Sequence, residues 1–279
     1  MTDFVLTLSC EDQVGIVHAV ARFLAEHGSN IEDSQQYGDR ATGRFFMRVH
    51  ALGDADDLRE AFRAVAEQFA MTWELRDAAV PGRVLVMVSQ QGHCLNDLLY
   101  RRSTGSLHAE IPVVVGNHRD FATLVAAHGS AFEYVPVVAD AGKAAAEARL
   151  LALVREHRID LVVLARYMQV LSEDLLRALP VPAINIHHSF LPSFKGARPY
   201  HQAHERGVKL IGATAHYVTA TLDEGPIIEQ EVARVDHTHT PERLVAVGRD
   251  LESMALARAV GWHLDHRVLR NGARTVVFR

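Results

Sequence analysis

The sequence predicts an α/β protein of two domains, a small α+β domain followed by a larger domain with a mostly parallel β-sheet. The chain has 279 residues, and at about 150 residues per domain this length suits two domains. Segments before residue 81 follow the order β-α-β-β-α-β, whereas later segments alternate between apolar strands and amphipathic helices. The content of 48% hydrophobic and 23% charged residues is typical of a soluble globular protein.

The first domain is expected over residues 1–80 and resembles the ferredoxin-like split βαβ arrangement. Its first helix is expected to be capped by Asp12 and to end at Gly28, because apolar residues between them recur with the helical period. Apolar residues on one side also predict a second helix around Phe62. The four expected strands are Phe4–Leu8, Ile31–Tyr37, Arg44–Ala51 and Met71–Arg76.

A Pro- and Gly-containing segment, 77–82, predicts a linker before the second domain at 83–279. Apolar runs with helical segments between them predict a parallel sheet that is covered on both faces, and such sheets bind ligands at the carboxyl ends of their strands. A long helix is expected from Pro241 and a closing hairpin at Val268–Phe278. The expected strands are Arg83–Ser89, Ile111–Gly116, Phe132–Val138, Asp160–Ala165, Ala183–His187, Ile211–Val218 and Pro226–Val235.

Charge and hydropathy argue against nucleic-acid and membrane partners. Residues 1–82 hold 7 Lys and Arg against 14 Asp and Glu, and the remainder holds 22 against 20, so no basic stripe follows a phosphate backbone. Apolar runs such as Val84–Val88 are far shorter than the roughly 20 residues that span a bilayer. With only Cys10 and Cys94, and no basic residue before Phe4–Leu8 to suit a signal peptide, we expect a cytoplasmic protein.

Three polar residues near strand ends form a candidate catalytic set. Asn185 and His187 lie two residues apart on a predicted strand and therefore face the same side, and Asp223 precedes a later turn. An amide, an imidazole and a carboxylate together can stabilise an oxyanion and move protons without a metal. From the residues alone, His187 could also be an ordinary packed histidine, and Asn185 and Asp223 could be ordinary turn formers.

The order of these motifs resembles that of formyltetrahydrofolate-dependent formyltransferases. The resemblance runs through Asn185–His187, Ser189, Leu191–Pro192 and His216, and ends at Asp223–Ile228. It implies that Asn185, His187 and Asp223 are the catalytic residues and that His216 supports them. It also implies that folate lies between two walls, formed by Met168, Gln169, Val170 and Leu171 and by Val218, Thr219 and Leu222.

Within that group, the chain resembles the formyltetrahydrofolate deformylases. Ser89–Leu99 lacks the small turn that suits a substrate phosphate, and both it and Ser193–Tyr200 are similar to deformylase segments. Residues Ser9–Val17 and Gly28–Ile31 resemble an ACT domain, a module that often binds amino acids. The resemblance thus implies an ACT domain, with Asp12, Gly15, Asn30 and Ile31 as its ligand site, fused to a formyltransferase-type, Rossmann-like domain.

The implied reaction is hydrolysis of 10-formyltetrahydrofolate by water to formate and tetrahydrofolate, which feeds formate to purine synthesis and balances the one-carbon folate pool. The resemblance implies no metal, no cofactor beyond the folate substrate, an amino-acid effector at the ACT domain and a homo-oligomer. Three alternatives stay open. They are formyl transfer to a small amine, a metal hydrolase using histidines such as His201 and His204, and an amino-acid sensor without activity.

Overall fold

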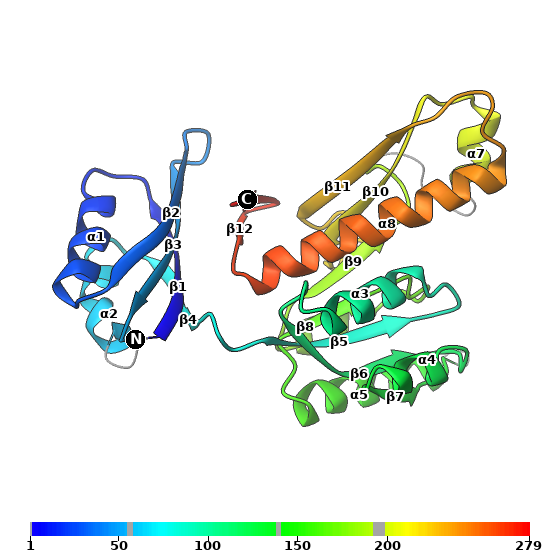
Figure 1. The fold of residues 1–279 in the computed structure, drawn as a ribbon, viewed down its shortest axis with the longest axis horizontal. Helices are drawn as coiled ribbons and strands as arrows, with labels where there is room; N and C mark the ends of the chain where they lie inside the picture. Colours follow the sequence, from blue (N-terminus) through cyan, green and yellow to red (C-terminus); the bar gives the residue numbers. More distant parts are fainter. Residues whose placement is uncertain (1, 55–57, 138–140, 192–198) are drawn as a thin grey trace. The chain divides into compact units, whose positions relative to one another are not determined.

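The computed structural model describes residues 2–54, 58–137, 141–191 and 199–279, and it divides into two compact units (Figure 1). Unit 1 holds Met1–Pro81 and Asp265–Arg279, and unit 2 holds Gly82–Leu264. Of the segment Ser193–Tyr200, all but the last two residues lie outside the described ranges. Within those ranges, no helix is both long and apolar enough to cross a membrane.

Unit 1 is an antiparallel sheet with two helices on one face (Figure 1). The strand order is β2-β3-β1-β4, so β1 is central and pairs with both β3 and β4. Side chains two apart on β1, such as Phe4, Leu6 and Leu8, point to the same face and are buried in the core with the helices. The elements are β1 (Thr2–Glu11), α1 (Ile16–Glu26), β2 (Asn30–Asp39), β3 (Arg44–Gly53), α2 (Leu58–Gln68) and β4 (Thr72–Asp77).

The start of α1 differs from the prediction that Asp12 caps it. The helix begins at Ile16, its N-cap is Gly15 with φ 101°, and no side chain caps it. Glycine adopts this left-handed conformation without a steric penalty, which lets the chain turn into the helix later than the polar signal indicated. The carboxylate of Asp12 instead lies over the backbone of Gly38, where an added Cβ would meet Asp12 Oδ2 at 2.8 Å.

The C-terminal hairpin, β12 (Val268–Asn271) and β13 (Arg274–Val277), forms around the expected turn but groups with unit 1. The sequence placed residues 265–279 in the second domain. The buried carboxylate of Asp39 accepts a hydrogen bond from Asn271 Nδ2 at 2.7 Å and pairs with Arg274 at 3.0 Å. Because these partners are more than 200 residues apart in the chain, no local pattern predicted the grouping.

Unit 2 is a seven-stranded sheet in the order β11-β10-β9-β8-β5-β6-β7, in which β10 is antiparallel to both of its neighbours, β9 and β11, and the remaining neighbours are parallel. The strands are β5 (Gly82–Val88), β6 (Ala109–Gly116), β7 (Ala131–Tyr134), β8 (Leu161–Leu164), β9 (Ala183–His187), β10 (Leu210–Tyr217) and β11 (Ile227–Arg234). The predicted architecture, a ferredoxin-like domain followed by a mostly parallel, Rossmann-like domain, is confirmed.

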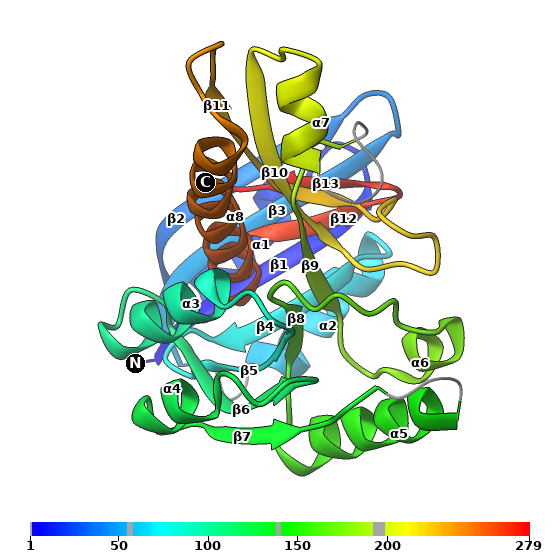
Figure 2. The ribbon, with the colours of Figure 1, turned by 90° about the vertical axis from the view of Figure 1, so that its right-hand side faces the viewer.

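Helices cover both faces of this sheet (Figure 2). The chain crosses from β5 to β6 in one direction and from β7 back to β8 in the other, so right-handed crossovers place α3 and α5 on opposite faces. Helix α8 packs beside α3, and α6 packs beside α5. The helices are α3 (His93–Ser103), α4 (Ala122–Ala127), α5 (Ala141–Glu156), α6 (Glu173–Ala178), α7 (Pro199–Glu205) and α8 (Pro241–Leu264).

Candidate active site

The site lies where the strand order of unit 2 reverses. Strands β5 and β8 are neighbours, but the chain leaves them toward opposite edges of the sheet, which opens a crevice at their carboxyl ends. Ser89, directly after β5, accepts a hydrogen bond from the Met168 backbone at 2.9 Å and donates its own N–H to the Arg166 carbonyl at 3.3 Å. These bonds fix the segment after β8 against the end of β5.

Strands β9 and β10 present the polar side chains. On β9, Asn185 and His187 point to one side, and the intervening Ile186 is buried on the other. On β10, His216 lies directly opposite Asn185 in the antiparallel register. Opposed residues of paired strands share a face, so these three side chains gather on one side of the sheet.

Asp223 reaches the same place because the chain folds back after β10. The Tyr217 N–H donates to the Pro226 carbonyl at 3.0 Å, which closes the loop between them. Gly225 packs so closely that an added Cβ would lie 1.7 Å from the Tyr217 carbonyl oxygen, so only glycine fits. Asp223 itself has φ 58°, a left-handed conformation that is rare outside glycine and concentrates at functional sites.

The carboxylate of Asp223 lies between two imidazoles. Its Oδ2 is 3.3 Å from His187 Nδ1, and its Oδ1 is 3.7 Å from His216 Nε2. The hydrogen bond from His187 is the main reason that the pKa of Asp223 lies below its usual value, ahead of the opposing effect of burial. Asp223 is therefore ionised at neutral pH, as a proton acceptor must be.

His216 is neutral and orients Asn185. Burial lowers the pKa of His216, and its Nδ1 donates to the Tyr217 carbonyl at 3.0 Å. The other nitrogen, Nε2, then accepts from Asn185 Nδ2 at 3.3 Å. One N–H of the Asn185 amide is thereby held by His216, and the second can donate to a substrate oxygen.

One cavity of about 240 Å³ contains all the catalytic, supporting and folate-binding residues that the sequence predicted. Asn185, His187, His216 and Asp223 form its polar part. Apolar side chains at its edge are open to solvent, since Met168 and Val170 are each 58% exposed and Leu222 is 61% exposed. The remaining predicted wall residues that line it are Gln169, Leu171, Val218 and Thr219. An apolar slot that ends in donors and a carboxylate suits a flat aromatic ring with a reactive polar group.

Among the further residues that line the cavity are Arg166 and His188, to which the sequence assigned no catalytic role. The His188 ring stacks on His187 with 5.1 Å between centroids. Burial, and next the charge of Arg166, lower the pKa of His188 to about 4, so His188 is neutral at pH 7. The sequence signal that could have identified His188 is its adjacency to His187. The signal for Arg166 is its position just after β8.

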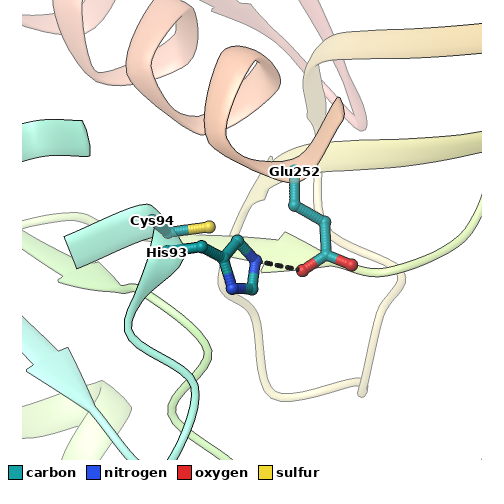
Figure 3. A group of neighbouring side chains, drawn as sticks. All are labelled: His93, Cys94 and Glu252. Carbon is teal, nitrogen blue, oxygen red and sulfur yellow. Dashed lines mark hydrogen bonds and ion pairs between the residues drawn. The ribbon is translucent and has the colours of Figure 1, made fainter. Parts of the chain in front are cut away.

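Arg166 pairs with Glu252, which belongs to a polar cluster with His93 and Cys94 (Figure 3). Cys94 and Glu252 are buried, and His93 is partly buried. His93 Nε2 is 2.8 Å from Glu252 Oε2, and the ligating atoms of all three residues lie within 4.8 Å of one another. Within the described ranges this is the one cluster whose ligand atoms are spaced closely enough to hold a metal ion. His201 and His204 are not part of it. A cation would meet the guanidinium of Arg166, 3.4 Å from Glu252, and burial raises the pKa of the Cys94 thiol, which disfavours thiolate ligation. The cluster is therefore better suited to hydrogen bonding.

The residues predicted to bind an effector in unit 1 are less closely gathered. Gly15 lines an open cavity of about 500 Å³ beside α1, but Asp12, Asn30 and Ile31 are not among its lining residues. Asn30 and Ile31 begin β2, where the exposed Asn30 side chain donates to Glu32 at 2.6 Å. Ile31 packs against the core.

Comparison with known proteins agrees with this two-part architecture. The family described as "Formyl transferase" matches residues 82–260, and the family described as "ACT domain" matches residues 4–67. A formyltetrahydrofolate deformylase of Corynebacterium sp. is 53% identical over 99% of this chain and 98% of its own length. One from Bacillus subtilis is 50% identical over 98% of this chain and 93% of its own.

A solved structure gives the same result in three dimensions. The crystal structure of formyltetrahydrofolate deformylase from Burkholderia mallei superposes with a TM-score of 0.95, at 51% identity and over the full length of both chains. These similarities extend through both units and include the strands and loops that carry the cavity. The chain therefore belongs to the formyltetrahydrofolate deformylase family.

Proposed function

We propose that this protein hydrolyses 10-formyltetrahydrofolate to formate and tetrahydrofolate, with Asn185, His187 and Asp223 as the catalytic residues. The observation that carries the proposal is the meeting of these three side chains at the polar end of one apolar cavity. The deformylase names of its relatives agree with this reaction and do not favour formyl transfer to an amine. Formate supply to purine synthesis and balance of the folate pool follow from this activity.

The geometry supports a direct attack by water. Asp223, ionised beside His187, orients a water molecule and takes one of its protons as the water oxygen bonds to the formyl carbon. Asn185 and protonated His187 donate to the oxyanion that forms. The C–N10 bond then breaks, the proton held by Asp223 passes to N10, and the formic acid formed releases its remaining proton to give formate.

His187 is suited to this role by its surroundings. Its Nδ1 faces Asp223, and its Nε2 is buried without a hydrogen-bond partner among the described residues. Asp223 has a second imidazole partner, His216, but burial lowers the pKa of His216 and keeps it neutral. We assign proton transfer to Asp223, stabilisation of the oxyanion to Asn185 and His187, and the orientation of Asn185 to His216.

The test is turnover of purified protein on 10-formyltetrahydrofolate, with no amine acceptor and with a strong chelator present. We expect equimolar formate and tetrahydrofolate, and Asp223→Asn should lower turnover by roughly 10²–10⁴-fold because it removes the base. Asp174→Asn, at a carboxylate that is 93% exposed, is the matched control. A folded Asp223→Asn variant with normal turnover would refute the role of Asp223, and loss of activity to the chelator would refute a metal-free reaction.

We further propose that residues 1–80 regulate a catalytic region that begins at residue 83. An amino acid would bind near the Gly15 turn, which the match to the ACT family and the open cavity beside α1 support. Calorimetry with each common amino acid tests this, and the absence of both heat and any change in turnover would refute it. We also propose a homo-oligomer, to be measured by light scattering, and a cytoplasmic location, which the two buried free thiols support.

A further inference from the structure

A buried guanidinium lies in the wall of the cavity and uses few of its hydrogen-bond donors. The Arg166 side chain is 9% exposed, and its Nε and Nη1 atoms have no hydrogen-bond partner among the described residues. The backbone of Arg166 has φ 63°, a conformation that costs an L-residue roughly 1–2 kcal/mol. Burial of a charge with unused donors is also unfavourable. Both features are typical of a residue retained for function.

Arg166 is held in place by an ion pair that leaves its buried Nε and Nη1 donors without a hydrogen bond. Its Nε is 3.4 Å from Glu252 Oε2, and no hydrogen bond is made. Both oxygens of Glu252 already accept closer bonds, from His93 Nε2 at 2.8 Å and from the Tyr200 hydroxyl at 2.8 Å. Glu252, itself 1% exposed on α8, therefore neutralises and positions the guanidinium without occupying its N–H groups.

The guanidinium belongs to the same cavity as the proposed catalytic groups. Arg166 lines it together with Asn185, His187 and His188. The charge of Arg166 acts on His188, which stacks on His187, so the guanidinium lies close to the histidine pair. The acidic groups acting on His188 are Asp223 and Glu252, and His187 and Arg166 are the basic ones. The wall of the cavity therefore contains a cationic group that the mechanism above does not use.

We propose that Arg166 is the binding site for the formate product. The inference rests on the proposed hydrolysis, because that reaction turns a neutral formyl group into an anionic carboxylate beside this wall. A guanidinium binds a carboxylate through two parallel N–H donors, a geometry that lysine does not reproduce. Because the carboxylate charge arises only after the C–N bond has broken and the formic acid has lost its proton, Arg166 binds the formate product more strongly than the neutral formyl group of the substrate.

Direct binding of formate to the folate-free protein gives the first test. We would titrate ¹³C-labelled formate and follow its line width by NMR for wild type, Arg166→Lys and the control Arg177→Lys, whose residue is 68% exposed on α6. Lysine keeps a positive charge beside Glu252, which preserves the fold, but loses the paired donors. We expect saturable binding in wild type, binding weakened by about 10- to 150-fold in Arg166→Lys, and no change in the control.

Product inhibition gives the second test. Formate should inhibit tetrahydrofolate formation, and Arg166→Lys should raise the inhibition constant by the factor found in the titration while KM for the folate stays unchanged. A double variant, Arg166→Met with Glu252→Gln, removes both charges together and leaves no buried ion unpaired, so it serves if the single variant does not fold. It too should lose formate binding.

The outcomes separate this site from the proposed reaction. Equal formate affinity in wild type and Arg166→Lys, or no binding by wild type, would overturn the site even if hydrolysis is observed. Formate binding that depends on Arg166, in a protein that releases no formate from 10-formyltetrahydrofolate, would confirm an anion site and refute the proposed reaction instead.

Discussion

The two units differ in how their predicted functional residues are arranged. In unit 2, residues from the ends of β8 and β9, from β10 and from the loop after it line a single cavity. In unit 1, Gly15 lines a cavity without Asp12, Asn30 or Ile31. The difference teaches that the order of motifs predicts a shared site more reliably when the motifs follow neighbouring strands, because a sheet brings the ends of its strands together.

The largest effect expected is on the stability of unit 1. Phe62 is fully buried between α2 and the sheet, and its ring packs edge-on against Phe23 and Trp73. Phe62→Ala should lower the free energy of unfolding by about 3–5 kcal/mol through lost burial and a cavity. Urea denaturation would measure this, with Tyr37→Ala at a 48% exposed ring as the control. If turnover per folded molecule also fell, the packing of unit 1 would affect the cavity of unit 2, and the two units could not be treated as independent.

The next effect concerns catalysis in unit 2. Asn185→Ala removes an oxyanion donor and should lower kcat by about 10²–10³-fold, as at other oxyanion sites. Rates of tetrahydrofolate formation at saturating substrate would measure it. Asn30→Ala in unit 1 is the matched amide control and should leave kcat unchanged when no amino acid is added. A decrease below about tenfold in Asn185→Ala would mean that the amide orients substrate rather than stabilising the oxyanion.

A pH titration of stability tests the buried histidine next to the catalytic pair. The pKa of His188 is lowered from 6.5 to about 4, so between these values the unfolded chain binds a proton that the folded chain does not. Stability therefore falls with decreasing pH in this window, by up to about 1.4 kcal/mol per pH unit from His188. His188→Gln should reduce the slope in urea denaturation, whereas the exposed His18→Gln should not. Some slope will remain, because burial also lowers the pKa of His216 and His266.

The smallest effect is expected at the start of β2. Asn30→Ala removes one exposed hydrogen bond to Glu32 and should change the free energy of unfolding by no more than about 0.5 kcal/mol. Thermal denaturation would check this. A larger loss would show that Asn30 has a structural role in unit 1 that its exposed position does not indicate, and would weaken its assignment to an effector site.

The sequence by itself determined the strands, the main helices and the candidate catalytic set. The strand Ala183–His187 was predicted at its observed bounds, because an apolar run with turns on both sides is a local property. The facing of Asn185 and His187 follows from the two-residue period of a strand. The role of Asp223 came only through the order of motifs, since nothing local indicated that its loop folds back.

Only the tertiary structure decided which distant residues pair. Arg166 and Glu252 are 86 positions apart, and Asp39 meets Asn271 across 232, so neither pair leaves a trace in a sequence window. The start of α1 at Ile16 likewise depends on the left-handed turn of Gly15 rather than on the polar Asp12. Periodicity and turn chemistry act over a few residues, whereas buried charges and the C-terminal hairpin depend on contacts that exist only once the chain has folded.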